Sequence, residues 1–194
     1  HRLQASARSG IVFYARRECA RRCFELGLMT LEVFAARNPG VEIHIYGDKL
    51  GKLSFPYIDH GHITPEQING IYNRCFAGLS LSFTNVSLVA LEMLAAGCIP
   101  VVNDTVQIRT DLDNPFVYYA PPYPQALAAQ LESVVANRDF DSLSAAAAAS
   151  VHSTTWDEAG ATVDSILRRA LRESTHPFNS ATGMHSQPSS KTLS

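Results

Sequence analysis

The sequence predicts an α/β fold, a doubly wound parallel Rossmann-like sheet of about six strands with helices on both faces. Two observations support this prediction. Short apolar runs rich in β-branched and aromatic residues alternate with longer amphipathic stretches along most of the chain. Short segments containing Gly, Pro or Asn separate the two kinds, a pattern typical of parallel strands joined by crossover helices.

The first half of the chain supplies three strands and two helices. The strands are predicted at residues 10–16, 41–47 and, more weakly, 56–63. Between the first two, Phe24, Leu28 and Leu31 recur at helical spacing, and Asn38-Pro39-Gly40 ends that helix. The second helix begins with Thr64-Pro65-Glu66-Gln67, which has the residue types of a capping box with Pro at the first helical position.

The second half continues the alternation. Strands are predicted at residues 77–83, 98–104 and 116–120, and helices at 87–96, 124–138, 142–151 and 156–171. Gly97 stands where a glycine commonly ends a helix. We expect one domain over residues 1–172 and a disordered tail over residues 173–194, which are rich in Ser, Thr, Pro and His.

The composition excludes several classes of function. A net charge of −2 over 194 residues gives no electrostatic case for binding nucleic acid or an anionic membrane. No apolar run is long enough to form a transmembrane segment, and the N-terminus lacks the apolar core of a signal peptide. The four scattered cysteines fit a reducing compartment, so we expect a cytoplasmic protein.

Two pairs of residues have spacings that metal ligands can have. Cys19 and Cys23 are four apart, and His60 and His62 lie on one side of a predicted strand. Neither pair has a third ligand nearby in the sequence. We favour buried thiols for the first pair and a polar strand end for the second, and we expect no metal.

Basic residues follow the first predicted strand. In doubly wound folds, ligands bind beyond the carboxyl ends of the strands, where Arg16 lies and which Arg22 can reach. Two guanidinium groups there suit a diphosphate, whose paired oxygens accept bidentate hydrogen bonds. The alternative, solvated charges at the start of a helix, is favoured for Arg21.

A helix N-terminus follows the fourth predicted strand. Thr84 or Asn85 can cap it, and its unpaired N–H groups attract phosphate. The N–H groups expected to do so belong to Ser87, Leu88 and Val89. Glu92, about one turn further, is placed to accept hydrogen bonds from ribose hydroxyls, or it is an exposed helical glutamate. No Gly-rich dinucleotide fingerprint or P-loop is present.

Three segments together resemble a known family. The segments FYAR (13–16), ARRCFELG (20–27) and SFTNVSLVALEMLAAGCIPVVND (82–104) are similar to the C-terminal half of retaining GT-B glycosyltransferases of family 4. Arg16 and Arg22 stand where the family has Arg and Lys, and Glu92 is similar to the second Glu of its Glu-x7-Glu block. The resemblance covers about residues 10–172, and the subgroup most similar is the bacterial rhamnosyltransferases that use dTDP-rhamnose.

The resemblance implies a donor-binding domain for a dTDP-, UDP- or GDP-linked sugar. Arg16 and Arg22 would act catalytically on the leaving diphosphate, no metal would be required, and a missing N-terminal domain would bind a glycan or glycolipid acceptor. This chain alone would then be inactive, and the whole enzyme could be peripheral at the inner face of the membrane. Three positions depart from the family pattern: Thr84 replaces the first Glu, Ala15 replaces Gly, and Arg22 replaces Lys.

Two other functions stay open on the sequence. The chain could be a nucleotide or nucleotide-sugar binding module without catalysis, or a non-catalytic partner subunit. The other is a GT-B epimerase acting on a nucleotide sugar, which would require further acidic and histidine residues in the cleft.

Overall fold

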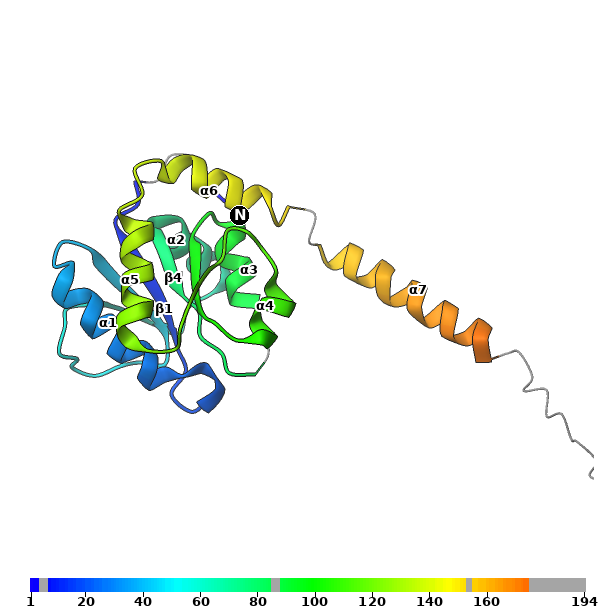
Figure 1. Cartoon of the computed structure of the whole chain (residues 1–194), viewed down its shortest axis with the longest axis horizontal. Coiled ribbons are helices and arrows are strands. Elements are labelled where there is room, and N and C mark those ends of the chain that lie inside the picture. Colours follow the sequence, from blue (N-terminus) through cyan, green and yellow to red (C-terminus); the bar gives the residue numbers. More distant parts are fainter. Residues whose placement is uncertain (4–6, 85–87, 153–154, 175–194) are drawn as a thin grey trace, which may run out of the picture. The chain divides into compact units, whose positions relative to one another are not determined.

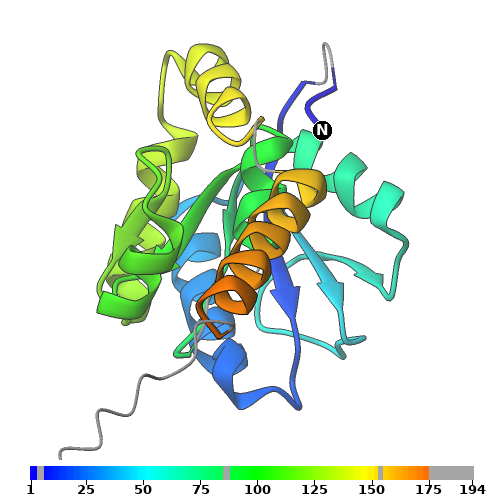
Figure 2. The same cartoon turned by 90° about the vertical axis from the view of Figure 1, so that its right-hand side faces the viewer.

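The computed structural model describes residues 1–3, 7–84, 88–152 and 155–174, which fall into two units, residues 1–153 and 154–194. The first unit is built on a parallel sheet of six strands in the order β3-β2-β1-β4-β5-β6. The strands are β1 (Gly10–Ala15), β2 (Glu42–Gly47), β3 (Ile58–Gly61), β4 (Cys75–Leu79), β5 (Ile99–Asn103) and β6 (Tyr118–Ala120). Figure 2 shows β1, in blue, beside β2, in lighter blue.

Helices cover both faces of the sheet (Figure 1). They are α1 (Phe24–Arg37), α2 (Pro65–Arg74), α3 (Leu88–Ala95), α4 (Val106–Leu112), α5 (Pro124–Val135) and α6 (Phe140–Ala149), with a short 3-10 turn, η1 (Ala20–Arg22), before α1. Helices α1 and α5 pack together on one face, α2 and α3 lie on the other, and α6 packs against α3. The predicted doubly wound α/β sheet is therefore confirmed.

The second unit contains α7 (Trp156–Ser174), whose apolar side chains are largely exposed, Trp156 by 80%. The predicted disordered tail lies outside the described residues from 175 onward. None of the helices in the described ranges combines the length and the apolar character that crossing a bilayer requires.

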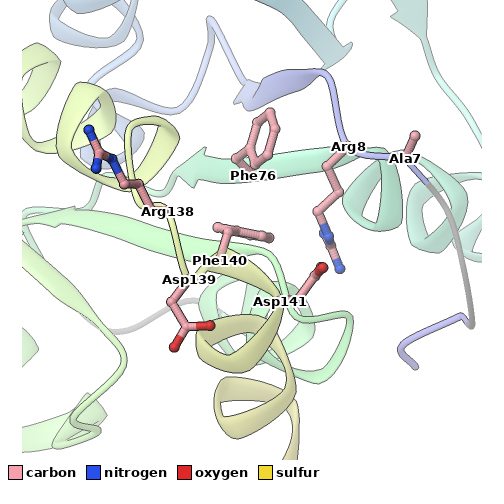
Figure 3. Close-up of a pocket in the computed structure, with 7 residues that line it drawn as sticks. All are labelled: Ala7, Arg8, Phe76, Arg138, Asp139, Phe140 and Asp141. Atoms are coloured by element: carbon pink, nitrogen blue, oxygen red, sulfur yellow. The ribbon is translucent and has the colours of Figure 1, made fainter.

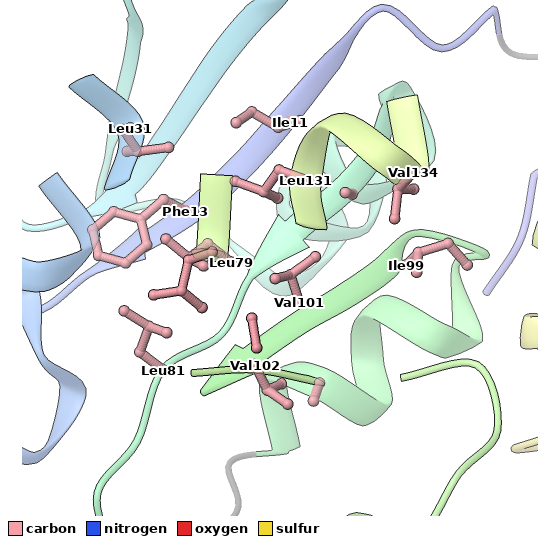
Figure 4. Packing of buried hydrophobic residues seen from close by; sticks show 14 of the residues in the cluster. Ile11, Phe13, Leu31, Leu79, Leu81, Ile99, Val101, Val102, Leu131 and Val134 are labelled. Atoms are coloured by element: carbon pink, nitrogen blue, oxygen red, sulfur yellow. The ribbon is translucent and has the colours of Figure 1, made fainter. Parts of the chain in front are cut away.

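The central strand β1 divides its side chains between two cores. Ile11, Phe13 and Ala15 join the larger cluster, with residues of α1 and α5, whereas Val12 joins a smaller cluster with residues of α2 and α3. Figure 4 shows Ile11 and Phe13 among Leu31, Leu79 and Leu131 of the larger cluster. Because successive side chains of a strand point to opposite faces, the apolar side chains of β1 pack into the cores on both faces of the sheet.

The helix signals read from the sequence are present. Thr64 accepts a hydrogen bond from the Gln67 backbone N–H, and the Gln67 side chain accepts one from the Thr64 backbone N–H, which completes the capping box. Gly97 follows α3 with a φ of +68°, a left-handed conformation that favours glycine. Both predictions are confirmed.

Several element boundaries differ from the predicted ranges, and one helix was not predicted. The predicted fourth strand, 77–83, is observed as Cys75–Leu79, because α2 ends at Arg74 and the chain passes directly into extended backbone. The first predicted helix is observed from Phe24, directly after Cys23, which has a left-handed conformation with φ +53°. Helix α4 was not predicted, although Thr105 caps it by accepting a hydrogen bond from the Ile108 N–H.

Gly27 of α1 is predicted to be sensitive to substitution, because a Cβ there would lie against the ring of Phe13 in the core. We expect Gly27→Ala to lower the free energy of unfolding by about 1–3 kcal/mol through overpacking. Gly70 in α2 is the matched control, since a Cβ there meets open space. Gly70→Ala is expected to raise stability by about 0.5–1 kcal/mol. Urea titration of both variants measures this, and equal effects would contradict the packing argument.

Candidate functional site

The order of the strands identifies where a ligand would bind. Strand β1 connects to β2 on one side, and the chain later returns to place β4 on its other side, so the order reverses between β1 and β4. Open α/β sheets bind ligands outside the carboxyl ends of the strands at such a switch point. The residues that follow β1 and β4 are those singled out from the sequence.

A cavity of about 270 Å³ lies at this edge of the sheet. It is lined by Tyr14, Arg16, Tyr46, Gly47, His62, Ile63, Ile68, Val89 and Glu92. These come from the ends of β1 and β2, the segment between β3 and α2, and helices α2 and α3. The structure thus brings together three of the predicted site residues, Arg16, Val89 and Glu92.

Arg16 is exposed at the end of β1 and turns back onto its own strand. Its Nη1 donates a hydrogen bond to the Tyr14 hydroxyl at 3.0 Å, and its guanidinium carbon lies 6.0 Å from the centre of the Tyr14 ring. The Tyr14 ring in turn stacks on Tyr46, with centroids 4.9 Å apart. The guanidinium therefore has an aromatic support and keeps donors available for an anion.

Glu92 contributes the carboxylate of the cavity from α3. Although the residue is exposed, the protein packed around the carboxyl raises its pKa by desolvation. An ionised carboxylate accepts hydrogen bonds through both oxygens, so Glu92 can accept them from ligand hydroxyls.

Arg22 lines a smaller neighbouring hollow rather than this cavity. The two share Tyr14 and Val89, and the smaller one is completed by Leu79, Ser80 and Leu81. Arg22 is half-buried at the end of η1. The two arginines thus line neighbouring hollows that share Tyr14 and Val89.

The start of α3 is only partly described. Thr84 is exposed, and its N–H donates a hydrogen bond to the Ser82 hydroxyl; Leu88 is the exposed first residue of the helix. Asn85 and Ser87 lie outside the described residues. The predicted phosphate-binding N–H groups of this helix therefore stay a prediction.

Sequence reasoning missed the tyrosines around the cavity and the glycine beside it. Tyr14 and Tyr46 lie within the predicted strands 10–16 and 41–47, and neither was singled out as a site residue. Gly47 has a φ of +107°, and a Cβ there would meet the Ala15 carbonyl oxygen. A signal for these residues was present in the sequence, because Tyr14 and Tyr46 each lie near the end of a predicted strand.

The two histidines of the HGH segment, His60 and His62, lie in different surroundings. The His60 ring stacks on buried His44, with His44 Nδ1 and His60 Nε2 3.0 Å apart, whereas His62 lines the cavity. Cys23 is buried, and burial raises the pKa of its thiol to about 11, while Cys19 is half-buried. Within the described ranges, no three His, Cys, Asp or Glu side chains are grouped to hold a metal ion.

A larger cavity, of about 550 Å³, lies where the strands begin (Figure 3). Its lining includes Arg8, Phe76, Arg138 and Phe140. The Arg8 guanidinium donates hydrogen bonds to the backbone carbonyls of Tyr72, Cys75 and Ala96 and to the Ser144 hydroxyl. These bonds tie α2, α3 and α6 together, so we assign Arg8 a structural role.

The family model described as "WsaF, C-terminal domain" matches residues 9–132, more than half of the chain. A comparison with curated proteins found no sequence match.

Solved structures share the fold at low sequence identity. The pneumococcal O-GlcNAc transferase GtfA, solved with UDP and GlcNAc, is 16% identical with a TM-score of 0.66, over 85% of this chain and 37% of that one. TarM is 16% identical with a TM-score of 0.62, over 88% and 36%. The catalytic domain of a cholesterol-α-glucosyltransferase from Helicobacter pylori is 14% identical with a TM-score of 0.60, over 75% and 99%. The chain thus spans little more than a third of the length of TarM and GtfA.

The His44–His60 pair is predicted to make stability depend on pH. Burial lowers the pKa of both imidazoles, that of His44 further through the nearby His60. The unfolded chain, with histidines titrating near about pH 6.5, therefore takes up protons first on acidification. We expect the free energy of unfolding to fall between pH 7.5 and pH 5.5, by about 1 kcal/mol for buried His44.

Urea titrations of the wild type and of His60→Gln at the two pH values measure this effect. His60→Gln should weaken the pH dependence, whereas His152→Gln, at an exposed site, should leave it unchanged. An identical pH dependence in the wild type and His60→Gln would contradict a role for the pair.

Proposed function

The chain belongs to the WsaF C-terminal domain family, and from this premise we propose that it is the nucleotide-sugar donor domain of a glycosyltransferase. The observation that carries the proposal is that Arg16 and Glu92 line one cavity at the switch point of the sheet. A cation and a carboxylate on one cavity match the two polar parts of a nucleoside diphosphate, its phosphates and its ribose.

In this proposal, Arg16 and Arg22 bind the diphosphate from the two neighbouring hollows, together with the N–H groups around Ser87, Leu88 and Val89. Their role in catalysis is electrostatic, since they stabilise the charge that develops on the diphosphate as the glycosidic bond breaks. Charge-assisted hydrogen bonds from arginine are stronger than the attraction of a helix terminus, so the arginines dominate. Glu92 accepts hydrogen bonds from the ribose.

Further details rest on the resemblance to family 4. We propose a retaining transfer without a metal cofactor, with rhamnose as the candidate sugar and a dTDP-, UDP- or GDP-linked donor. GtfA, a fold neighbour, was solved with UDP, which supports a nucleotide ligand at this fold. Because the chain spans about a third of that protein, we also propose that a further domain binds a glycan or glycolipid acceptor in the cytoplasm.

One observation favours a second candidate, a nucleotide-binding module without catalysis. The residue at the first Glu position of the family block is Thr84, which is exposed and carries no charge. A carboxylate expected near the donor sugar is therefore missing. Such a module would bind nucleoside diphosphates through the same cavity but would not transfer a sugar.

Nucleotide binding is the first test. We expect dTDP, UDP or GDP at millimolar concentration to raise the melting temperature of the 194-residue chain, because a ligand that binds the native state stabilises it by mass action. AMP, which lacks a diphosphate, is the control. The absence of a shift with dTDP, UDP, GDP and ADP would contradict the donor-site proposal.

Substitution of Arg16 tests the role of the guanidinium. In an enzyme that includes the acceptor domain, Arg16→Ala is expected to lower turnover more than a hundredfold, the range seen when a group that stabilises developing charge is removed. Arg17→Ala is the matched control, since the Arg17 guanidinium lies over the Phe24 ring outside the cavity lining. Steady-state kinetics measure both, and near-normal turnover of Arg16→Ala would rule out its role.

A further inference from the structure

Tyr14, the last residue but one of β1, lines both the cavity of Arg16 and the neighbouring hollow of Arg22. It is half-buried, and its ring stacks on that of Tyr46, with centroids 4.9 Å apart and planes inclined by 17°. Phenylalanine presents the same aromatic ring and could stack in the same way. The packing therefore accounts for the ring of Tyr14 and leaves its hydroxyl to be explained.

The strands fix the position of the Tyr14 ring. Tyr14 and Tyr46 are direct partners in the parallel pairing of β1 with β2, and Ala15 and Gly47 are the next pair. A Cβ on Gly47 would lie 3.0 Å from the Tyr14 ring, so the glycine lets the backbone of β2 approach that ring closely. The ring is thus held by a stacked neighbour and by the backbone of the adjacent strand, which sets where its hydroxyl lies.

This hydroxyl holds the Arg16 side chain. Arg16 Nη1 donates a hydrogen bond to it at 3.0 Å, and the guanidinium carbon lies 6.0 Å from the centre of the Tyr14 ring. Arg16 is exposed beyond the end of β1, where a long side chain can take many rotamers unless a contact restrains it. The contact with Tyr14 restrains it beside the cavity that both residues line.

The group that restrains Arg16 carries no charge. Among the described residues, none of the salt bridges includes Arg16. The carboxylate of Asp48 accepts a hydrogen bond from the Arg17 backbone N–H. A carboxylate partner would orient the guanidinium and also offset its charge, whereas a hydroxyl orients it without offsetting the charge. One such bond occupies one of the five donors of the guanidinium and leaves the others for an anion.

We propose that Tyr14 is a positioning residue, whose hydroxyl holds the Arg16 guanidinium at the cavity and leaves its charge available to an anionic ligand. The identity of that ligand, a nucleoside diphosphate, rests on the proposed function, whereas the restraint of Arg16 by Tyr14 does not. A side chain that is ordered before the ligand arrives loses less entropy on binding, so the restraint increases affinity.

The competing explanation is that Tyr14 serves only to pack its ring on Tyr46, and that the bond to Arg16 is an incidental surface contact. Loss of the hydroxyl would then change neither the mobility of Arg16 nor the affinity for a ligand. Tyr14→Phe separates the two explanations, because it keeps the stacked ring and removes the hydroxyl alone.

The first measurement is ¹⁵N NMR relaxation of the Arg16 side-chain Nε–H group in the ligand-free chain. In Tyr14→Phe we expect its order parameter to fall below about 0.6, the range of flexible groups, from a higher value in the wild type. Tyr57→Phe is the matched control, since it removes an exposed hydroxyl that donates a 2.8 Å bond to the Gly51 carbonyl and lines neither hollow. It should leave Arg16 unchanged. Equal order parameters in the wild type and Tyr14→Phe would overturn the positioning role, whether or not the chain binds a nucleotide.

The second measurement is a double-substitution cycle on dTDP and UDP binding by calorimetry. Tyr14→Phe should weaken binding about fivefold in the wild type and less than twofold in Arg16→Ala, because the effect passes through Arg16. Tyr57→Phe should leave the affinity unchanged. Equal weakening by Tyr14→Phe in both backgrounds would overturn the proposal. Failure of the wild type to bind either nucleotide would instead overturn the proposed function, and the order parameter of Arg16 would still decide the role of Tyr14.

Discussion

The packing of β1 on both faces is the constraint on which the rest of the structure depends. This strand pairs with β2 on one edge and β4 on the other, and its apolar side chains alternate between two cores. Hydrogen bonding and packing therefore use every part of the strand up to Ala15. Only past its carboxyl end can the chain present a charged side chain to solvent, and Arg16 is that residue. The location of the cavity follows from how this strand is buried.

The fold could be predicted from the sequence because its local signals agree with one another. Gly and Asn-Pro-Gly segments separate the strands, and Thr64-Pro65-Glu66-Gln67 begins a helix with a complete capping box. The signals failed where two elements adjoin without a turn residue, as at Arg74-Cys75. They also failed for α4, whose seven residues are too few for a periodic pattern to stand out.

The site was predictable only where position along a strand or helix decides it. Arg16 and Glu92 could be found because the end of a strand and the first turns of a helix are defined in sequence. Arg22 was expected to reach the same space, and it lines the adjacent hollow, which shares Tyr14 and Val89 with the cavity. Tyr46 and Tyr72 are 26 residues apart and meet only through tertiary packing, so no local pattern could have paired them. The same holds for His44 and His60.

The two charged residues of the cavity, Arg16 and Glu92, differ in how the protein affects their charge. Arg16 is exposed and always protonated, so its interaction with an anion depends on charge and is screened by salt. Glu92 lies where the surrounding protein disfavours its charge, which raises the pKa of its carboxyl. A ligand's phosphates would thus be attracted before contact, whereas its hydroxyls would be recognised only at contact. If the proposed function holds, selectivity among nucleotides depends on the Glu92 side of the cavity.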